Sequence, residues 1–138
     1  MKIAEAMTRT VRVANPNQTI REAAEMMVQF DTGAIPVGEH DRLVGMITDR
    51  DIAVRAVAHG RPADTRIRDV MTDDVKYCFE DEDVDEVARN MAELQVRRLP
   101  VLDRGKRLVG IVAIGDIAAA EEPEIVGDTL AAISEPGR

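Results

Sequence analysis

Two halves of this 138-residue chain repeat each other, and the duplication decides which architecture the chain can adopt. The four pairs of matching blocks, in chain order, are residues 3–8 with 67–72, 19–30 with 83–94, 33–37 with 97–101, and 43–54 with 108–119. The first three pairs share an offset of 64 residues, and one inserted residue moves the last pair to 65. Four ordered blocks in nearly one register indicate an internal duplication rather than chance similarity.

Each copy contains the pattern of an amphipathic helix in its first half. Thr19 with Glu22, and Asp83 with Glu86, have the spacing at which an N-cap oxygen and an acid three residues later satisfy the first free N–H groups of a helix. Apolar residues then recur every three or four positions and predict one buried stripe per helix, formed by Ile20, Ala23, Ala24 and Met27 in the first copy and by Val84, Val87, Ala88 and Met91 in the second.

Two strands and a second helix follow in each copy. The short apolar runs AIPV and LVGMI, like LPVL and LVGIV, are separated by polar turn residues, as in two strands joined by a tight connection. The second helices are expected over residues 48–59 and 113–120, with Gly60 ending the first. A further short strand is expected near residues 11–13 and near residues 77–79.

The order in each copy is therefore strand, helix, strand, strand, helix. The expected fold class is α/β, of the α+β kind, with two tandem β-α-β-β-α repeats packed about a pseudo-twofold axis. The expected boundaries are residues 1–60 for the first repeat, 61–66 for a linker, 67–120 for the second repeat, and 121–138 for a C-terminal extension with a short helix near 125–133.

Composition excludes several classes of partner. The formal net charge of −8 repels polyanions, so we expect no nucleic-acid or anionic-membrane binding. The N-terminus lacks the apolar core of a secretory signal, and the longest apolar stretch is too short to cross a bilayer and contains Asp116. These features predict a cytoplasmic protein without a membrane span.

The reactive side chains are few and scattered. The single cysteine, Cys78, reads as a buried strand residue, and two histidines, His40 and His59, form no metal-ligand pattern. The only serine, Ser134, lies in a tail that contains Pro and Gly. We therefore expect no catalytic residues, no metal site and no enzyme, and the chemistry that remains is binding.

In these repeated blocks the chain resembles a tandem pair of CBS domains, which is called the Bateman module. It is similar in particular to the stand-alone bacterial members. The shared features are the MT dipeptide, the xPV strand and the LVG strand that leads into an xxDI helix, over residues 1–120. The resemblance implies a non-enzymatic regulatory module that binds an adenosine-containing ligand between its repeats and often dimerises. By this resemblance the protein is expected to form a homodimer and to act on a regulated protein of unknown identity. AMP, ADP or ATP is expected as a possible regulatory ligand, and no cofactor is obligatory.

The resemblance identifies residues 45–51 (GMITDRD) as the ribose-phosphate motif. A strand that ends before a helix presents free N–H groups to a phosphate, while Thr48 offers a hydroxyl and Asp51 can accept hydrogen bonds from ribose hydroxyls. The same pair, Thr48 and Asp51, is also a helix cap, and spacing alone leaves both interpretations open. The second repeat keeps Asp116 but has Ala113 in place of the threonine, so we expect a single nucleotide per chain.

Other residues complete the predicted site. Three arginines are candidate phosphate ligands, namely Arg50, Arg97 and Arg98. The alternative for each is exposure to solvent, and Arg97 and Arg98 could instead form an ion pair with Glu93. Four apolar residues are candidate walls for adenine and are equally ordinary core residues, namely Ala34, Ile35, Pro36 and Val11. The competing function is a ligand-independent protein-interaction or scaffold module whose clefts are simply packed.

Overall fold

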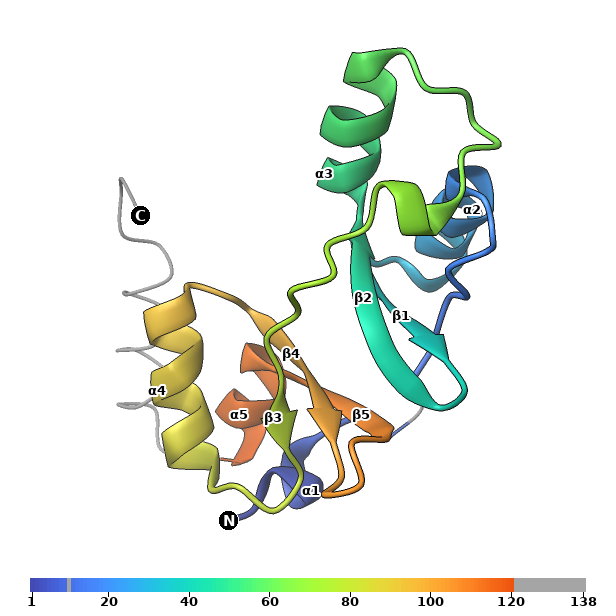
Figure 1. Cartoon of the computed structure of the whole chain (residues 1–138). Coiled ribbons are helices and arrows are strands. Elements are labelled where there is room, and N and C mark those ends of the chain that lie inside the picture. Colours follow the sequence, from blue (N-terminus) through green and yellow to red (C-terminus); the bar gives the residue numbers. More distant parts are fainter. Residues whose placement is uncertain (10, 121–138) are drawn as a thin grey trace. The chain divides into compact units, whose positions relative to one another are not determined.

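The computed structural model describes residues 1–9 and 11–120 of the chain. They form two compact units, one consisting of Arg12–Val75 and the other of Met1–Val11 with the chain from Lys76 onward. Figure 1 labels the helices and strands of both units, and each unit is described by itself. The helix expected near residues 125–133 lies outside the described residues.

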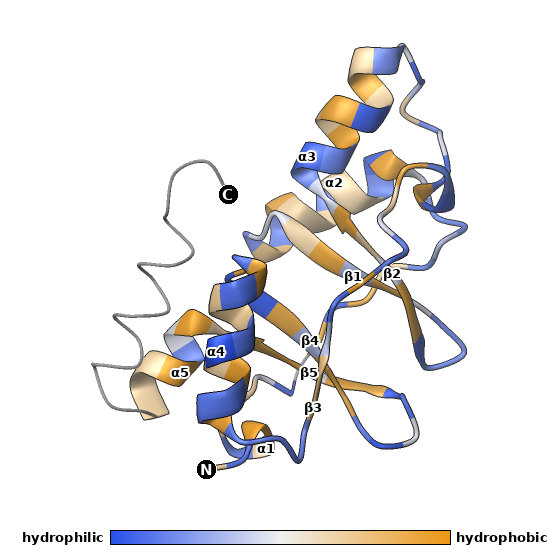
Figure 2. Cartoon of the chain, turned by 60° about the vertical axis from the view of Figure 1, so that its left-hand side comes forward, coloured by the Kyte–Doolittle hydropathy of each residue, from blue (hydrophilic) through white to orange (hydrophobic). Residues whose placement is uncertain are grey.

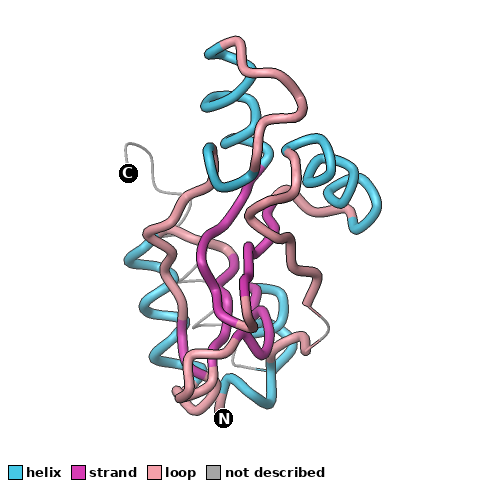
Figure 3. The backbone as a smooth tube through the Cα atoms, turned by 45° about the vertical axis from the view of Figure 1, so that its right-hand side comes forward, coloured by secondary structure: helices cyan, strands magenta, loops and turns pink. Residues whose placement is uncertain are grey.

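The unit Arg12–Val75 contains one helix, a two-stranded antiparallel sheet and a second helical stretch of mixed type. Its elements are α2 (Ile20–Phe30), β1 (Ala34–Glu39), β2 (Arg42–Thr48), α3 (Asp49–Asp51), a π-helical turn (Ile52–Ala56), a 3-10 turn (Val57–His59) and a second 3-10 turn (Ile67–Asp69). Figure 3 shows β2 leading directly into the helical stretch that follows it. The predicted order of helix, strand, strand and helix is confirmed for this unit.

Local sequence explains where these elements begin and end. Thr19 caps α2 with the predicted reciprocal pair of bonds, since its hydroxyl accepts from the Glu22 amide and the Glu22 carboxylate accepts from the Thr19 amide. The β1–β2 turn places His40 and Asp41 at positive φ, as a tight hairpin turn requires. Gly60 ends the second helical stretch in the left-handed region, as predicted.

Within its described residues, the other unit contains a three-stranded sheet in the order β3-β4-β5 and three helices. Its described elements are α1 (Ile3–Ala6), β3 (Cys78–Phe79), α4 (Val84–Leu94), β4 (Arg98–Leu102), β5 (Leu108–Ala113) and α5 (Ile114–Ala120). The strand β3 pairs in parallel with β4, and β4 pairs antiparallel with β5. The mixed α/β class predicted from the sequence is confirmed.

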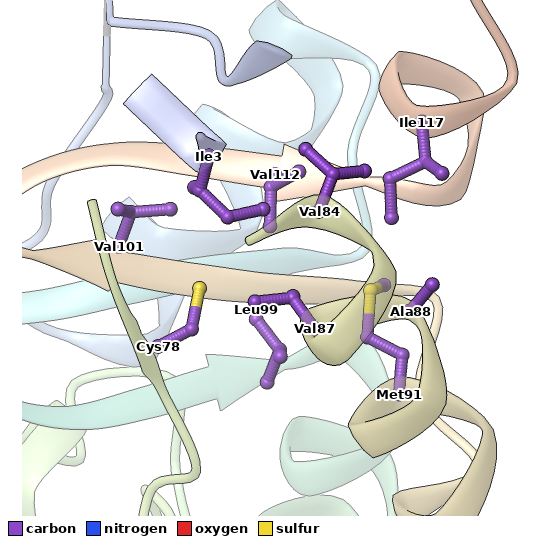
Figure 4. Packing of buried hydrophobic residues seen from close by; sticks show 10 residues of the cluster. All are labelled: Ile3, Cys78, Val84, Val87, Ala88, Met91, Leu99, Val101, Val112 and Ile117. Atoms are coloured by element: carbon purple, nitrogen blue, oxygen red, sulfur yellow. The ribbon is translucent and has the colours of Figure 1, made fainter. Parts of the chain in front are cut away.

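The core of this unit is formed where α4 packs against the sheet. The stripe predicted on α4 is buried in full, and Figure 4 shows its residues meeting those of the strands, of α1 and of α5. Figure 2 shows hydrophilic and hydrophobic residues alternating around α4, as an amphipathic surface helix requires. Burial of an apolar side chain contributes about 1.5–3 kcal/mol, so this stripe is the main attachment of α4.

The start of α4 differs from its prediction in one respect. Asp83 is the N-cap residue, but its side chain makes no capping hydrogen bond. Its carboxylate instead lies 3.7 Å from Lys2 Nζ and 3.9 Å from the N-terminal amino group. Both cations belong to the N-terminal segment, and they lie near the carboxylate that was expected to cap the helix. The local spacing of Asp83 and Glu86 does not reveal this contact.

The beginning of each repeat packs with the body of the other repeat. Ile3 lies in the core of the second repeat, and Ile67 lies in the core of the first. The amide of Thr8 donates to Ile111 of β5, and the amide of Met46 in β2 donates to Thr72. In the structure, the first residues of each sequence repeat therefore belong to the unit that contains the rest of the other repeat.

The strand expected near residues 11–13 is not formed. In the described part of this region, the ladder is reduced to a single parallel bridge between Ala14 and Val37. The corresponding prediction for residues 77–79 is confirmed, because Cys78 and Phe79 pair with Val101 and Leu102. A turn stabilised by hydrogen bonds between Asn15 and Gln18 follows this segment.

Candidate ligand-binding site

The end of β2 and the start of the following helix form a sharp corner. The amide of Thr48 donates to Asp51 Oδ2 over 3.0 Å, and the amide of Asp51 donates to Thr48 Oγ1 over 3.0 Å. This is a complete capping box, which satisfies two of the free N–H groups at the start of a helix. The second oxygen of the carboxylate, Oδ1, takes no part in it.

The beginning of β1 lies beside this corner. Ala34 is the register partner of Thr48, and the amide of Asp49 donates to the carbonyl oxygen of Gly33 over 2.9 Å. A Cβ atom at Gly33 would lie 2.8 Å from Asp49 Oδ2, so the absence of a side chain at this position lets the carboxylate approach the loop. The predicted residues Ala34, Thr48 and Asp51 are thus brought together.

Asp51 is the one buried charged residue among those described, with 8% of its surface exposed. Burial of a carboxylate is costly unless hydrogen bonds or an opposite charge compensate it. Here the Thr48 amide binds one oxygen, and Arg55 Nε lies 3.7 Å from the other. Arg50, the predicted phosphate ligand on the same turn, is exposed.

The other unit has an equivalent corner at the end of β5. The amide of Ala113 donates to Asp116 Oδ2 over 2.8 Å, so the carboxylate part of the capping box is present in both repeats while the hydroxyl part is present in one. Arg98 pairs in register with Ala113, and the Arg97 carbonyl accepts from the Ile114 amide over 3.0 Å. Both arginines are exposed at this second corner.

The remaining predicted residues are placed differently. Ile35 belongs to the core of its unit with 1% exposure, and Pro36 beside it is buried. Val11 is half-buried and belongs to the other unit, as do Arg97 and Arg98. The part of these residues in a ligand site stays a prediction.

Sequence reasoning missed two charged residues of the first corner, Asp49 and Arg55. Asp49 follows Thr48 directly, and its Oδ1 accepts from the Arg50 amide over 2.8 Å. Arg55 follows Asp51 by four residues, the spacing at which opposite charges meet on a helix, and that spacing is the signal that could have identified it. The corner therefore carries two acids and two arginines.

The described residues include the single cysteine and other candidate metal ligands. Cys78 is buried in β3, as predicted, and burial together with the nearby Glu82 raises its pKa to about 12. Within residues 1–9 and 11–120, His, Cys, Asp and Glu form no group of three placed to hold a metal ion. Among the same residues, the search for a helix with the length and apolarity of a membrane span found none.

Both units contain a helix, two antiparallel strands and a second helical stretch, with a strand-to-helix corner in each, and they define a tandem-repeat module. The CBS domain family matches residues 3–57 and 67–122, and the chain belongs to this family as a tandem CBS pair. Such pairs are in general regulatory domains. The resemblance predicted from the repeated motifs is confirmed.

Several relatives are short proteins that the chain covers almost completely. The chain is 43% identical over 133 residues to the CBS domain-containing protein YhcV of Bacillus subtilis, with 96% of this chain and 94% of the relative covered. It is 35% identical over 134 residues to hypoxic response protein 1 of Mycobacterium tuberculosis, covering 96% of this chain and 93% of the relative. The expected likeness to stand-alone bacterial members is thus confirmed.

Solved structures support the same assignment. The crystal structure of hypoxic response protein I, described with two coordinated zinc ions, superposes with a TM-score of 0.78 at 35% identity, covering 87% of this chain and 98% of that one. The CBS domain pair of protein MJ0100, in complex with 5′-methylthioadenosine and S-adenosyl-L-methionine, superposes with a TM-score of 0.74 at 34% identity, covering 87% and 94%. Some members of this fold therefore bind adenosine-containing ligands.

Proposed function

We propose that this protein is a non-enzymatic regulatory CBS pair that binds an adenosine-containing ligand of the AMP, ADP or ATP class at the corner formed by Thr48 and Asp51. Binding changes its conformation or its affinity for a regulated protein. The working form is a cytoplasmic homodimer with one nucleotide per chain. The ligand is regulatory, and no cofactor is obligatory.

The observation that carries the proposal is the state of the Asp51 carboxylate. It is buried, yet one of its oxygens lies outside the capping box and is available to accept hydrogen bonds from ribose hydroxyls. The adenosyl ligands in the MJ0100 structure support the class of ligand. Ala34 beside Thr48 offers small apolar surface for the base.

Phosphate recognition is the part of the proposal that rests on arginine. Arg50 is exposed on the same helical turn as Asp51, and a guanidinium can bind phosphate oxygens in a bidentate manner. A phosphate contact of Arg97 and Arg98, which belong to the other unit, stays a prediction.

The alternative function is a ligand-independent interaction module, and one observation favours it. The reciprocal bonds between Thr48 and Asp51 account for both side chains as a helix cap without any ligand. Asp116 makes the same contact with a backbone amide at a corner where Ala113 stands in place of the threonine. A structural role for these aspartates is therefore established, and a ligand role must be additional to it.

A thermal-unfolding panel with AMP, ADP, ATP, S-adenosylmethionine and NAD separates the two functions. A ligand at 100 times its dissociation constant adds about 2.7 kcal/mol to the free energy of unfolding. We expect at least one of these compounds to raise the melting temperature of the wild type. A panel in which none does so supports the interaction module.

The matched pair Asp51→Asn and Asp116→Asn assigns the site. Asparagine keeps an oxygen that can accept from the Thr48 or Ala113 amide, so both variants retain the carboxylate half of the cap. We expect Asp51→Asn to lose the ligand-induced shift and Asp116→Asn to keep it. Equal shifts in both variants would place the ligand elsewhere.

A further inference from the structure

We propose that Arg55 is a positioning residue that couples the ligand corner, formed by Thr48 and Asp51, to the connector, formed by residues 70–75. The chain continues from the connector into the other unit at Lys76. The coupling is a competition, because Arg55 binds the same Asp51 carboxylate that is assigned to the ribose. This inference rests on the proposed function and adds a mechanism of regulation to it.

Arg55 contacts both ends of this link. Its Nε lies 3.7 Å from Asp51 Oδ1, the oxygen outside the capping box, and its Nη1 donates to the carbonyl oxygen of Met71 over 3.2 Å. The Asp51 side chain is 11% exposed and the Arg55 side chain is 53% exposed, so the pair lies at the rim of the buried corner. A planar guanidinium is suited to hold two acceptors in fixed directions.

The connector is attached to β2, the strand that ends at the ligand corner. Thr72 and Met46 exchange two backbone hydrogen bonds of 2.8 and 2.9 Å. The Met71 sulfur packs over Gly45, where a Cβ atom would lie only 2.6 Å from Sδ. Arg55 adds a side-chain donor to this backbone attachment, and its orientation depends on Asp51.

The link exists in one repeat only. At the 65-residue offset that aligns the last pair of blocks, the position of Arg55 is occupied by Ala120, which has no donor for such a bond. The repeat with the arginine is also the repeat with the Thr48 hydroxyl. It carries a π-helical turn at Ile52–Ala56 where α5 is regular, and π turns in helices are frequent at functional sites.

The competition has a defined sign. Ribose hydroxyls that donate to Asp51 weaken its attraction for Arg55, so ligand binding loosens the hold of Arg55 on Met71. Thermodynamic linkage is reciprocal, so removal of Arg55 must strengthen binding at Asp51. Removal of a residue that merely stabilised the fold or contacted the ligand directly would leave binding unchanged or weaken it.

The test compares Arg55→Met with Arg21→Met in the full chain, with adenosine as the probe. Adenosine carries both ribose hydroxyls and no charge, so loss of a cation does not act through attraction of a phosphate. Arg21 forms an ion pair with Glu25 four residues later on α2 of the same unit, with Nε and Oε1 3.2 Å apart, and serves as the matched control. We expect Arg55→Met to bind adenosine about twofold to fivefold more tightly than the wild type, and Arg21→Met to equal it.

Hydrogen exchange at the Thr72 amide, which donates to Met46, gives a readout without ligand. We expect this amide to exchange about twofold to fivefold faster in Arg55→Met than in Arg21→Met. Equal exchange in the two variants overturns the link to the connector, and equal or weaker adenosine binding by Arg55→Met overturns the competition. A wild type that responds to adenosine or to a nucleotide keeps its proposed function in either case, whereas a wild type that binds none of them loses the function and the coupling together.

Discussion

The sulfur of Met71 lies against Gly45 so closely that a Cβ atom at position 45 would be 2.6 Å from Sδ. The same relationship recurs in the other unit, where a Cβ atom at Gly110 would be 2.7 Å from the sulfur of Met7. A threonine follows each methionine, and its carbonyl oxygen would lie 2.9 Å from the same Cβ atom. Thr72 is this residue for Gly45, and Thr8 is this residue for Gly110. The MT dipeptide and the LVG glycine of each repeat are therefore a packed pair, formed between segments that belong to different copies in the sequence.

This packing predicts that Gly45→Ala and Gly110→Ala both destabilise the protein. A methionine side chain can move, but the backbone carbonyl oxygen of the threonine can move only by breaking its bridge to the neighbouring strand. Overpacking of this kind costs about 1–3 kcal/mol. Urea unfolding measures the loss, and wild-type stability in both variants would contradict the packing.

Gly115→Ala is the opposite case and serves as the control. A Cβ atom at Gly115 meets nothing within 4 Å, and the residue lies inside α5. Alanine is favoured over glycine in a helix by about 0.8–1.0 kcal/mol, so this variant is expected to be more stable by up to about that amount. A loss of stability in the same urea assay would mean that α5 is not helical at this position.

The capping difference between the repeats predicts a pair of changes with opposite signs. Thr48→Ala removes the hydroxyl that accepts from the Asp51 amide and is expected to cost about 1 kcal/mol. Ala113→Thr places a hydroxyl three residues before the Asp116 amide and is expected to stabilise the start of α5 by about 0.5–1 kcal/mol. Thermal unfolding without ligand measures both, and two changes of equal sign would contradict the capping account.

Cys78 predicts a dependence on pH. Its pKa is raised from the usual value near 9 to about 12, first by burial and then by Glu82. The folded protein therefore holds the thiol proton more tightly than the unfolded chain, so this contribution to stability is complete below pH 9 and is lost as the pH rises towards 12. The unfolding free energy of Cys78→Ala is expected to fall less steeply than that of the wild type over this range, and parallel slopes would contradict the assignment.

The same burial predicts the reactivity of the thiol. A thiolate is the species that attacks disulfide reagents, and the folded protein holds almost none at pH 8. We expect a chromogenic disulfide reagent to label Cys78 only after denaturant is added. Rapid labelling of the folded chain would show that β3 opens.

The sequence predicted those parts of the fold that depend on local periodicity or on the duplication. Thr19 and Glu22 form the box that their spacing indicates, and Gly60 ends its helix. Asp83 has the same local signal and makes no cap bond, because the side chain of Lys2 and the N-terminal amino group lie near its carboxylate. Contacts between segments far apart in the chain decide such cases, and local spacing carries no information about them.

The exchange of the repeat beginnings could not be predicted for the same reason. Each copy contains a complete set of elements, so periodicity fits a compact first copy as well as an exchanged one, and only the packing of Ile3 and Ile67 distinguishes them. At the site, Thr48 and Asp51 were predicted from their motif. Arg55, the ion-pair partner of Asp51 Oδ1, was missed although the four-residue spacing was present in the sequence.

Calorimetric titration of the responding nucleotide into the wild type, Asp51→Asn and Asp116→Asn tests the central claim most directly. The account predicts one nucleotide per chain in the wild type, an unchanged isotherm for Asp116→Asn, and no measurable binding for Asp51→Asn in a protein that still unfolds cooperatively. Undiminished binding by Asp51→Asn would contradict it.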